Sequence, residues 1–230
     1  SRAAILLSQI EQSRKEHIEK TLPQRRDIDG KMILALRPFL QKRDYAGAAD
    51  RIKNTLVRLP EYKGHKPMLD REEKRFREAE KLYREIVGAI GVLPEKTPMK
   101  VELKNGKTME GNFRGVKGND TLWLGIHGTR LTEVAMGSLI AASGLQSLPL
   151  LTVADLHLYE EDFAQAAATI AEVLAEDVDL SQEFFVRLQL ARTFLMNADL
   201  AGMAGADEKK ITTFIRKYQM PLPKDFSLDV

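Results

Sequence analysis

The sequence contains no cysteine and no long apolar run, and each absence excludes a class of function. Without cysteine the chain can form no disulfide, no thiolate metal site and no cysteine nucleophile. The longest apolar stretch, Val134 to Leu145, is interrupted by glycine and serine and is too short to cross a bilayer. Residues 1–22 carry charges where a secretory signal would have its apolar core. We therefore expect no membrane insertion of this fragment.

Residue patterns that support catalysis are also missing. The histidines are scattered, with no ligand partner at helical or hairpin spacing: His17, His65, His127 and His157. The sequence has no Gly-x-Ser-x-Gly motif, and Gly111, Gly115 and Gly118 fall within a strand and a turn rather than before a helix. We interpret the acids Glu160-Glu161-Asp162 as a helix start, where the helix dipole favours negative charge. The prediction is a protein that is not an enzyme, with no cofactor and no metal.

Charge is distributed unevenly along the 230 residues, although the net charge is only +2. Residues 1–100 hold 23 Lys+Arg against 15 Asp+Glu, a balance of +8, and residues 151–230 hold 7 against 14, a balance of −7. A basic segment can indicate nucleic acid or an anionic membrane surface. An acidic half in the same chain is a simpler counterpart, so we favour packing of the two halves over a polyanion site.

Two stretches far apart in the sequence carry the same helix. Residues 44–56 (DYAGAADRIKNTL) align without a gap on residues 162–174 (DFAQAAATIAEVL). Aspartate, an aromatic residue, paired alanines, isoleucine and leucine recur at the same offsets, and such internal repetition indicates stacked repeat units. Asp44 and Asp162 are the expected N-caps.

Hydrophobic periodicity predicts the other elements. Helices are expected over 2–21, 32–40, 44–59, 70–90, 151–158, 184–196 and 207–218, with a short helical turn over 136–142. At Pro94 the period changes from helix to strand. Strands are expected over 99–103, 107–114, 121–126 and 129–134, and Asn105-Gly106 predicts a tight hairpin.

The repeated helix resembles the second helix of a tetratricopeptide repeat. The residues that carry this likeness are Leu36, Phe39, Asp44-Tyr45, Ala48, Ile52, Leu56 and Pro60 in the first copy, and Ala154, Asp162-Phe163, Ala166, Ile170 and Val173-Leu174 in the second. Alanines at a helix crossing let the two helices approach closely. The resemblance implies helical hairpins that bind a protein or peptide.

The middle of the chain resembles a small Sm-like β-barrel, through Val101, Leu103 to Gly106, Gly111, Phe113, Leu122 and Leu124. Similar segments occur beside helical repeats in bacterial membrane-anchored and kinase-associated proteins. Sm-like proteins bind RNA through a loop with a fixed Asp and Asn arrangement, which Lys117 to Asp120 does not reproduce. The resemblance therefore implies the barrel shape without RNA binding.

Together these observations predict an α+β chain of helical hairpins with a small antiparallel β-barrel in the middle. The expected parts are a helical region over 1–97, the barrel over 98–145, a second helical region over 146–220 and an extended tail over 221–230. We expect the two helical regions to touch. The expected role is a non-enzymatic protein-interaction or scaffolding module, an accessory region of a larger bacterial protein.

The candidate partner-binding residues are Arg37, Arg43, Arg51, Lys53 and Trp123. The four basic residues would face a peptide or an acidic protein partner. Strand alternation places Trp123 opposite Leu122 and Leu124. We favour a position for Trp123 at the junction between barrel and helices, and an exposed ligand platform is the alternative. Nucleic acid is the less favoured partner, and the sequence leaves it open.

Overall fold

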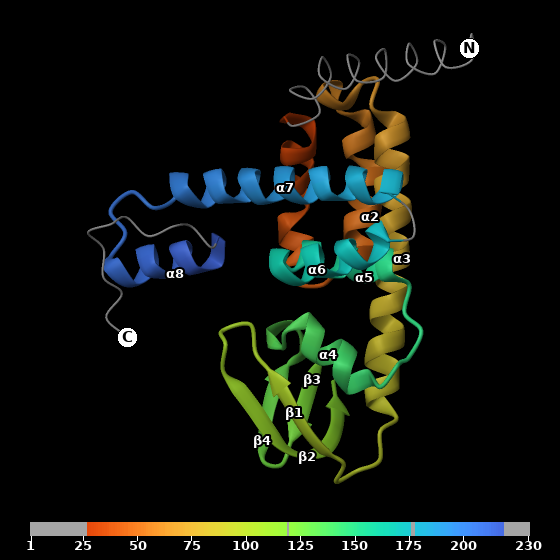
Figure 1. Cartoon of the computed structure of the whole chain (residues 1–230), viewed down its shortest axis with the longest axis vertical. Helices are drawn as coiled ribbons and strands as arrows, with labels where there is room; N and C mark the ends of the chain where they lie inside the picture. The colour runs from red at the N-terminus through yellow and green to blue at the C-terminus, as the bar shows by residue number, and fades with distance from the viewer. Residues whose placement is uncertain (1–26, 119, 176–177, 219–230) are drawn as a thin grey trace. The chain divides into compact units, whose positions relative to one another are not determined.

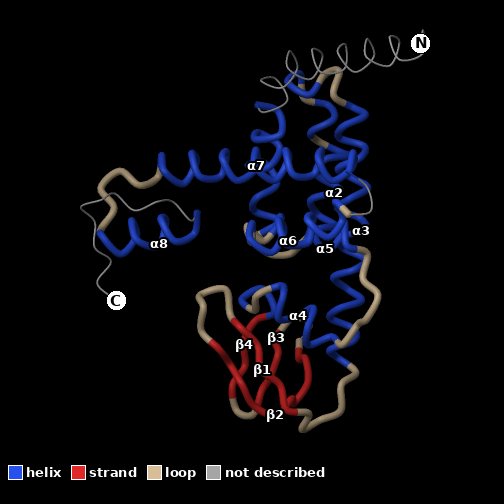
Figure 2. Tube along the Cα trace, viewed as in Figure 1, coloured by secondary structure: helices blue, strands red, loops and turns tan. Residues whose placement is uncertain are grey.

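The computed structural model describes residues 27–118, 120–175 and 178–218, and it confirms an α+β chain with an antiparallel sheet (Figures 1 and 2). The chain divides into two compact units. One unit is Leu36–Leu188, and the other combines Ser1–Ala35 with Gln189–Val230. The predicted helix over 2–21 and the tail over 221–230 lie outside the described residues.

Residues 27–40 form the first described helix. The labelled helices that follow are α2 (Tyr45–Asn54), α3 (Lys66–Gly91), α4 (Met136–Ser143), α5 (Leu150–Tyr159), α6 (Phe163–Leu174), α7 (Val178–Ala201) and α8 (Glu208–Tyr218). Short 3-10 turns cover Leu56–Arg58, Pro60–Tyr62 and Leu131–Glu133. The strands are β1 (Pro98–Glu102), β2 (Thr108–Lys117), β3 (Thr121–Leu124) and β4 (His127–Arg130).

The two copies of the repeated sequence begin with the same local geometry. Asp44 caps α2 by accepting a hydrogen bond from the backbone N–H of Gly47, and Asp162 caps α6 by accepting one from Gln165. The residue before each cap is in the left-handed region, with φ 56° at Arg43 and φ 60° at Glu161. Each copy is therefore the second helix of a hairpin with the same connection.

Helix α3 is the central element of the unit Leu36–Leu188. It begins at Lys66 rather than at Asp70, because Pro67 fits the first turn, where no backbone donor is needed. Its buried face consists of Leu69, Glu72, Phe76, Ala79, Leu82, Ile86 and Ile90. It packs against α2, α4, α5 and β2. The expected contact between the helical segments on either side of the sheet is therefore present within this unit.

The sheet is an antiparallel meander in the order β1-β2-β3-β4, with α4 packed on β1 (Figure 1). Its inner face buries Val101, Phe113, Leu122, Leu124 and Leu131. The predicted fourth strand is shifted, because residues 131–133 form a 3-10 turn instead. Beyond that turn, an isolated bridge pairs Leu103 with Val134. The closed barrel stays a prediction.

Two helix ends differ from the expectation. Helix α2 ends at Asn54 rather than at Leu59, and two 3-10 turns continue the chain past Pro60. Helix α7 is longer than the predicted 184–196. No helix within the described ranges has the length and apolarity that a membrane span requires.

The second unit contains the C-terminal part of α7 and helix α8. The Asp199 carboxylate accepts hydrogen bonds from the Tyr218 hydroxyl at 2.7 Å and from Lys217 Nζ at 2.9 Å. The rings of Phe214 and Tyr218 lie 5.1 Å apart, and both side chains are buried. These contacts hold α8 against the end of α7.

Candidate functional site

A buried arginine joins the two hairpin connections to the sheet. Arg43 Nε lies 2.8 Å from Glu160 Oε1, and Arg43 Nη2 lies 2.9 Å from Glu160 Oε2, so the pair is bidentate. Its remaining donors reach the backbone carbonyls of Leu131 and of Val134, the latter at 2.6 Å. The side chains of Arg43 and Glu160 are only 1% and 3% exposed. We call this set of contacts the Arg43 junction.

Further groups balance the charge of the Arg43 junction. Lys104, which follows β1, forms an ion pair with Glu160 Oε2, the oxygen that Arg43 Nη2 also contacts. Burial alone would raise the pKa of Glu160, but hydrogen bonds and charge from Arg43 and Lys104 outweigh it and lower the pKa. The Tyr45 hydroxyl lies 3.3 Å from Glu160, and burial raises the pKa of this phenol. Glu160 is therefore a fully paired carboxylate.

A second ion pair joins the two hairpin connections. Arg37 Nη2 lies 3.3 Å from Glu161 Oε1, with both side chains about one-quarter exposed or less. Basic residues of the first hairpin thus meet acidic residues of the second. This is the internal charge pairing that the asymmetry between the two halves of the sequence predicted.

A second buried charge cluster lies where α3, α5 and α7 meet. Arg187 Nη2 lies 2.6 Å from Glu72 Oε2, and Arg187 Nη1 lies 3.4 Å from Asp155 Oδ1. Arg75 pairs with the other oxygen of Glu72 at 3.2 Å. Burial raises the pKa of Asp155 from 3.8 to about 7, against the opposing charge of Arg187. We call this set the Asp155 cluster.

Aromatic rings enclose the Asp155 cluster. The rings of Tyr159 and Phe76 are stacked with centroids 4.4 Å apart. The Arg187 guanidinium lies 6.0 Å from the centroid of Tyr159 and 5.6 Å from that of Phe184. Tyr159, Phe76 and Phe184 are all buried. The side chains of Glu72 and Asp155 are 7% and 5% exposed, and those of Arg187 and Arg75 are 13% and 19% exposed.

The predicted partner-binding residues fall into different environments. Arg43 is buried in its junction and Arg37 is paired with Glu161, so neither guanidinium faces a partner in this structure. Arg51 and Lys53 are exposed on α2. Among the described residues, Arg51 contacts the Thr55 hydroxyl, at 3.4 Å. Of the basic candidates, Arg51 and Lys53 alone present their charge on the surface.

Trp123 lies on the face of the sheet opposite Leu122 and Leu124, as alternation predicted, and it is half-buried. Its cross-strand neighbours are Gly115 on β2 and Gly128 on β4. A Cβ placed on Gly128 would lie 2.9, 3.0 and 3.2 Å from three atoms of the indole, Cε2, Cζ2 and Cδ2. Such similar distances mean that the indole lies face-on over Gly128. These contacts are with the sheet, and a position of Trp123 at a junction with the helices stays a prediction.

Exposed basic residues lie close to Trp123 on the neighbouring strands. Lys117 Nζ lies 5.6 Å from the indole centroid. Lys117, Thr121 and Arg130 are opposite one another across β2, β3 and β4, so they share the face of Trp123. Arg114 is exposed in the β2 irregularity between Phe113 and Gly115. In the described part of the chain, Arg114, Lys117 and Arg130 form no ion pair.

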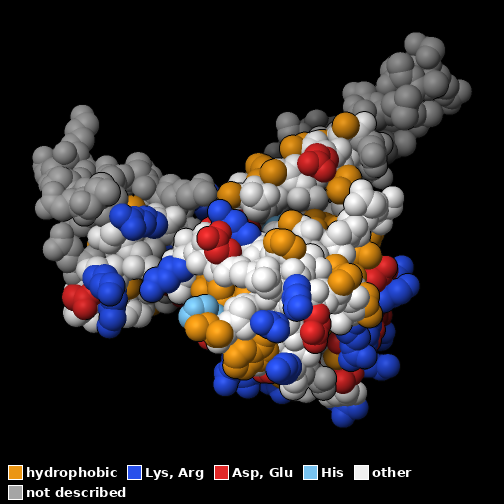
Figure 3. All heavy atoms as spheres, turned by 90° about the horizontal axis from the view of Figure 1, so that it is seen from below, with side chains coloured by type: hydrophobic (Ala, Val, Ile, Leu, Met, Phe, Trp, Pro, Cys, Tyr) orange, Lys and Arg blue, Asp and Glu red, His pale blue; other side chains and the backbone are white. Residues whose placement is uncertain are grey.

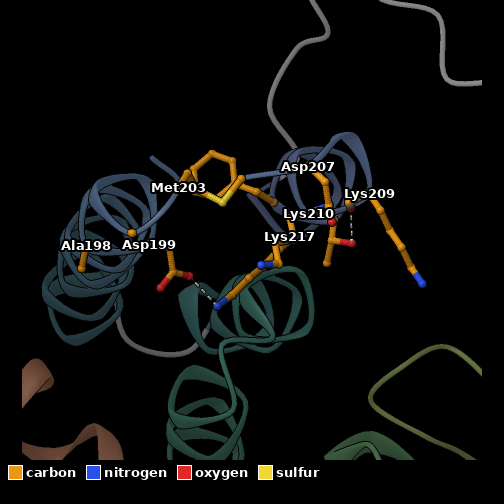
Figure 4. Close-up of a pocket in the computed structure, with 10 residues that line it drawn as sticks. Ala198, Asp199, Met203, Asp207, Lys209, Lys210 and Lys217 are labelled. Atoms are coloured by element: carbon orange, nitrogen blue, oxygen red, sulfur yellow. Dashed lines mark hydrogen bonds and ion pairs between the residues drawn. The ribbon is translucent and has the colours of Figure 1, made fainter. Parts of the chain in front are cut away.

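A pocket of about 620 Å³ lies between the end of α7 and α8 (Figure 4). Met203 and Phe214 supply apolar surface, and Lys209 and Lys210 extend from α8 along its side. The Asp207 carboxylate accepts a hydrogen bond from the backbone N–H of Lys210 at 2.9 Å, so Asp207 caps α8. The acids that line this pocket, Asp199 and Asp207, therefore have structural partners.

Comparisons of the chain with protein-family models, with curated proteins and with solved structures found no match. Among the described residues, no group of three or more acidic or histidine side chains could hold a metal ion. Any statement about function therefore depends on the geometry above.

Sequence reasoning missed the role of Glu160. Its position beside Asp162 indicated a helix start, and Asp162 is indeed the cap. Glu160 instead turns into the protein interior, toward an arginine 117 residues away in the sequence. The available signal was the reciprocal charge of the two hairpin connections, which are basic at 42–43 and acidic at 160–161.

Proposed function

We propose that this chain is a non-enzymatic protein-interaction or scaffolding module, an accessory region of a larger bacterial protein. The observation that carries the proposal is that the polar side chains that converge in the structure pair with one another in the interior. Arg43 and Glu160 are buried as a bidentate pair, and in the Asp155 cluster Arg187 contacts both Glu72 and Asp155. Buried contacts of this kind support a structural role, in which they hold elements in a defined arrangement.

The proposal includes tetratricopeptide-like hairpins around an Sm-like barrel. The identical caps and left-handed residues before α2 and α6 support a repeated hairpin. Barrel closure is supported by the bridge between Leu103 and Val134, which is flanked by two backbone hydrogen bonds of 2.8 Å. A scaffold built in this way would present fixed surfaces to a partner.

The proposed partner is an acidic protein segment, because several exposed basic residues form no ion pair with an acid among the described residues. Arg51 and Lys53 on α2 and the cations around Trp123 are examples. Complementary charge accelerates encounter and suppresses wrong partners. Attraction between exposed charges weakens as salt screens them.

The experiment is a binding comparison with the full chain. A fluorescent peptide rich in Asp and Glu should bind saturably and more weakly as salt rises, whereas a peptide with Lys in place of the acids should not bind. Oligo(dT) and oligo(U) test the alternative of a nucleic-acid-binding protein. Binding of the oligonucleotides without binding of the acidic peptide would overturn the proposal, as would substrate turnover that a single polar substitution abolishes.

A further inference from the structure

We propose that the outer face of the sheet, centred on Trp123, is the docking surface for this acidic protein segment. The inference rests on the proposed function and assigns it a site. We call the surface formed by Trp123, Arg114, Lys117 and Arg130 the Trp123 face. Tryptophan and arginine are the residues most enriched among those that dominate protein–protein binding energies.

The indole of Trp123 is half-buried. Strand register and the absence of a side chain on Gly128 let the ring lie flat on the backbone of β4. One face of the indole is thereby covered, and Lys117 Nζ lies 5.6 Å from its centroid. A half-buried tryptophan held in this way is a rigid apolar anchor, which loses little conformational entropy on binding.

The basic residues of the Trp123 face differ from those on the helices in whether they pair with an acid. On the helix surfaces, many basic residues are paired four residues away with an acid, as in Lys66–Asp70, Arg77–Glu73 and Arg84–Glu80. The basic residues of the Trp123 face have no such partner among the described residues. The acids Glu102 and Glu110 lie on β1 and in the first half of β2, and Asp120 lies in the turn between β2 and β3. The second half of β2 and all of β4, which flank Trp123, carry Lys117 and Arg130 and no acid.

An exposed isoleucine close to Trp123 in the sequence favours a protein partner over a nucleic acid. Ile126 is 86% exposed in the turn between β3 and β4, three residues from Trp123. An exposed isoleucine offers nothing to a phosphate or a base edge, but it adds apolar contact with a protein partner. Figure 3 shows Lys and Arg side chains beside apolar ones on the surface seen from below.

The test uses Trp123 itself, since it is the only tryptophan of the chain. An unlabelled acidic peptide without tryptophan is titrated into the full chain while the indole emission is recorded. We expect a saturable change in emission. The double variant K117E/R130E should bind the same peptide at least about tenfold more weakly, the effect of losing roughly 1.4 kcal/mol.

The matched control is R71E/K81E, which changes the net charge equally at two exposed positions of helix α3 and leaves the sheet intact. It should retain the emission change and most of the affinity. If R71E/K81E loses the peptide and K117E/R130E keeps it, the Trp123 face is the wrong site, although the proposed function survives. If labelled acidic peptide binds none of the proteins, or if oligo(dT) alone changes the emission, both proposals fail. Circular dichroism and unfolding midpoints show whether both variants remain folded.

Discussion

The Arg43 junction and the Trp123 face contain the same kinds of side chain in opposite states. In the junction, one carboxylate is surrounded by an arginine and a tyrosine that are shielded from water and by a lysine at the surface. On the Trp123 face, two arginines and a lysine lie close to an aromatic ring and remain exposed and unpaired within the described residues. Basic residue type alone therefore does not identify a binding site, because pairing and burial decide whether the charge is available.

The Arg43→Ala substitution gives the largest expected effect. It removes the bidentate partner of Glu160 and leaves the carbonyls of Leu131 and Val134 without their donor. Loss of one member of a buried ion pair typically costs about 3–5 kcal/mol. Urea unfolding measures this loss of stability. Arg51→Ala is the control, and its exposed position predicts a change within about 0.5 kcal/mol. Similar values for the two variants would contradict the distinction between buried and exposed arginines.

The Asp155→Asn substitution tests the Asp155 cluster through pH. Burial raises the pKa of Asp155 from 3.8 to about 7, so between these values the folded state holds a proton that the unfolded state has lost. That contribution to stability is complete below the unfolded pKa and is lost as pH rises through about 7. Asparagine cannot titrate. Relative to the original chain, D155N should therefore gain about 3 kcal/mol of stability between pH 5 and pH 8.

Unfolding free energies of both proteins across this pH range provide the measurement. The difference between them isolates Asp155, because Glu72, Arg75 and Arg187 face the same cluster in both. A pH-independent difference would mean that Arg187 keeps Asp155 ionised throughout.

Local rules predicted the elements that local interactions decide. Asp44 and Asp162 cap their helices, and the backbone of Gly106 has φ 79° at the hairpin that Asn105-Gly106 predicted. In each case the reason lies within a few residues of chain. The pairing of Arg43 with Glu160 has no local cause, since tertiary packing selects a partner 117 residues away. The sequence pattern indicated that the acids around position 160 lie at a helix start. It did not show which acid is the helix cap and which is a buried counter-ion.

The same limit explains the placement of Trp123. Alternation correctly put its side chain opposite Leu122 and Leu124. What covers that side depends on how the helices pack, and the packing that the structure has is α4 on β1 and α3 on β2. Only the cross-strand register reveals that a glycine lies beneath the indole.

The Trp123→Ala substitution should have a moderate effect on stability. The indole is half-buried and its described contacts are with Gly128 and Lys117. We expect a loss below about 1.5 kcal/mol, whereas Phe113→Ala in the sheet core should cost roughly 3–5 kcal/mol. The free energies of unfolding of the two variants provide the comparison. A loss as large as that of the core variant would support the interpretation of Trp123 as a junction residue.

Quenching of the indole emission by ions of opposite charge tests whether the basic residues of the Trp123 face set the field at the ring. Because Arg114, Lys117 and Arg130 lie close to the ring, iodide should quench the folded chain more strongly than caesium does. K117E/R130E should reverse that preference. Equal quenching by both ions would show that the cations do not set the local field.

The smallest expected effect comes from two glycine substitutions with opposite signs. Gly128→Ala places a Cβ within 2.9 Å of the indole, which must tilt away from β4. The backbone of Gly128 is not in the left-handed region, so displacement of the ring is the main consequence. The loss of stability should be below about 1 kcal/mol, the range of single cross-strand contacts.

Gly88→Ala is the matched control. Gly88 lies within α3, and a Cβ there would meet nothing within 4 Å. Alanine in place of glycine inside a helix is favourable by roughly 0.5–1 kcal/mol, so this variant should unfold at higher urea. The two variants should also differ in emission, because only Gly128→Ala moves the indole. An unchanged spectrum in Gly128→Ala would mean that the ring does not rest on Gly128, and the flat anchor on which the Trp123 face depends would be lost.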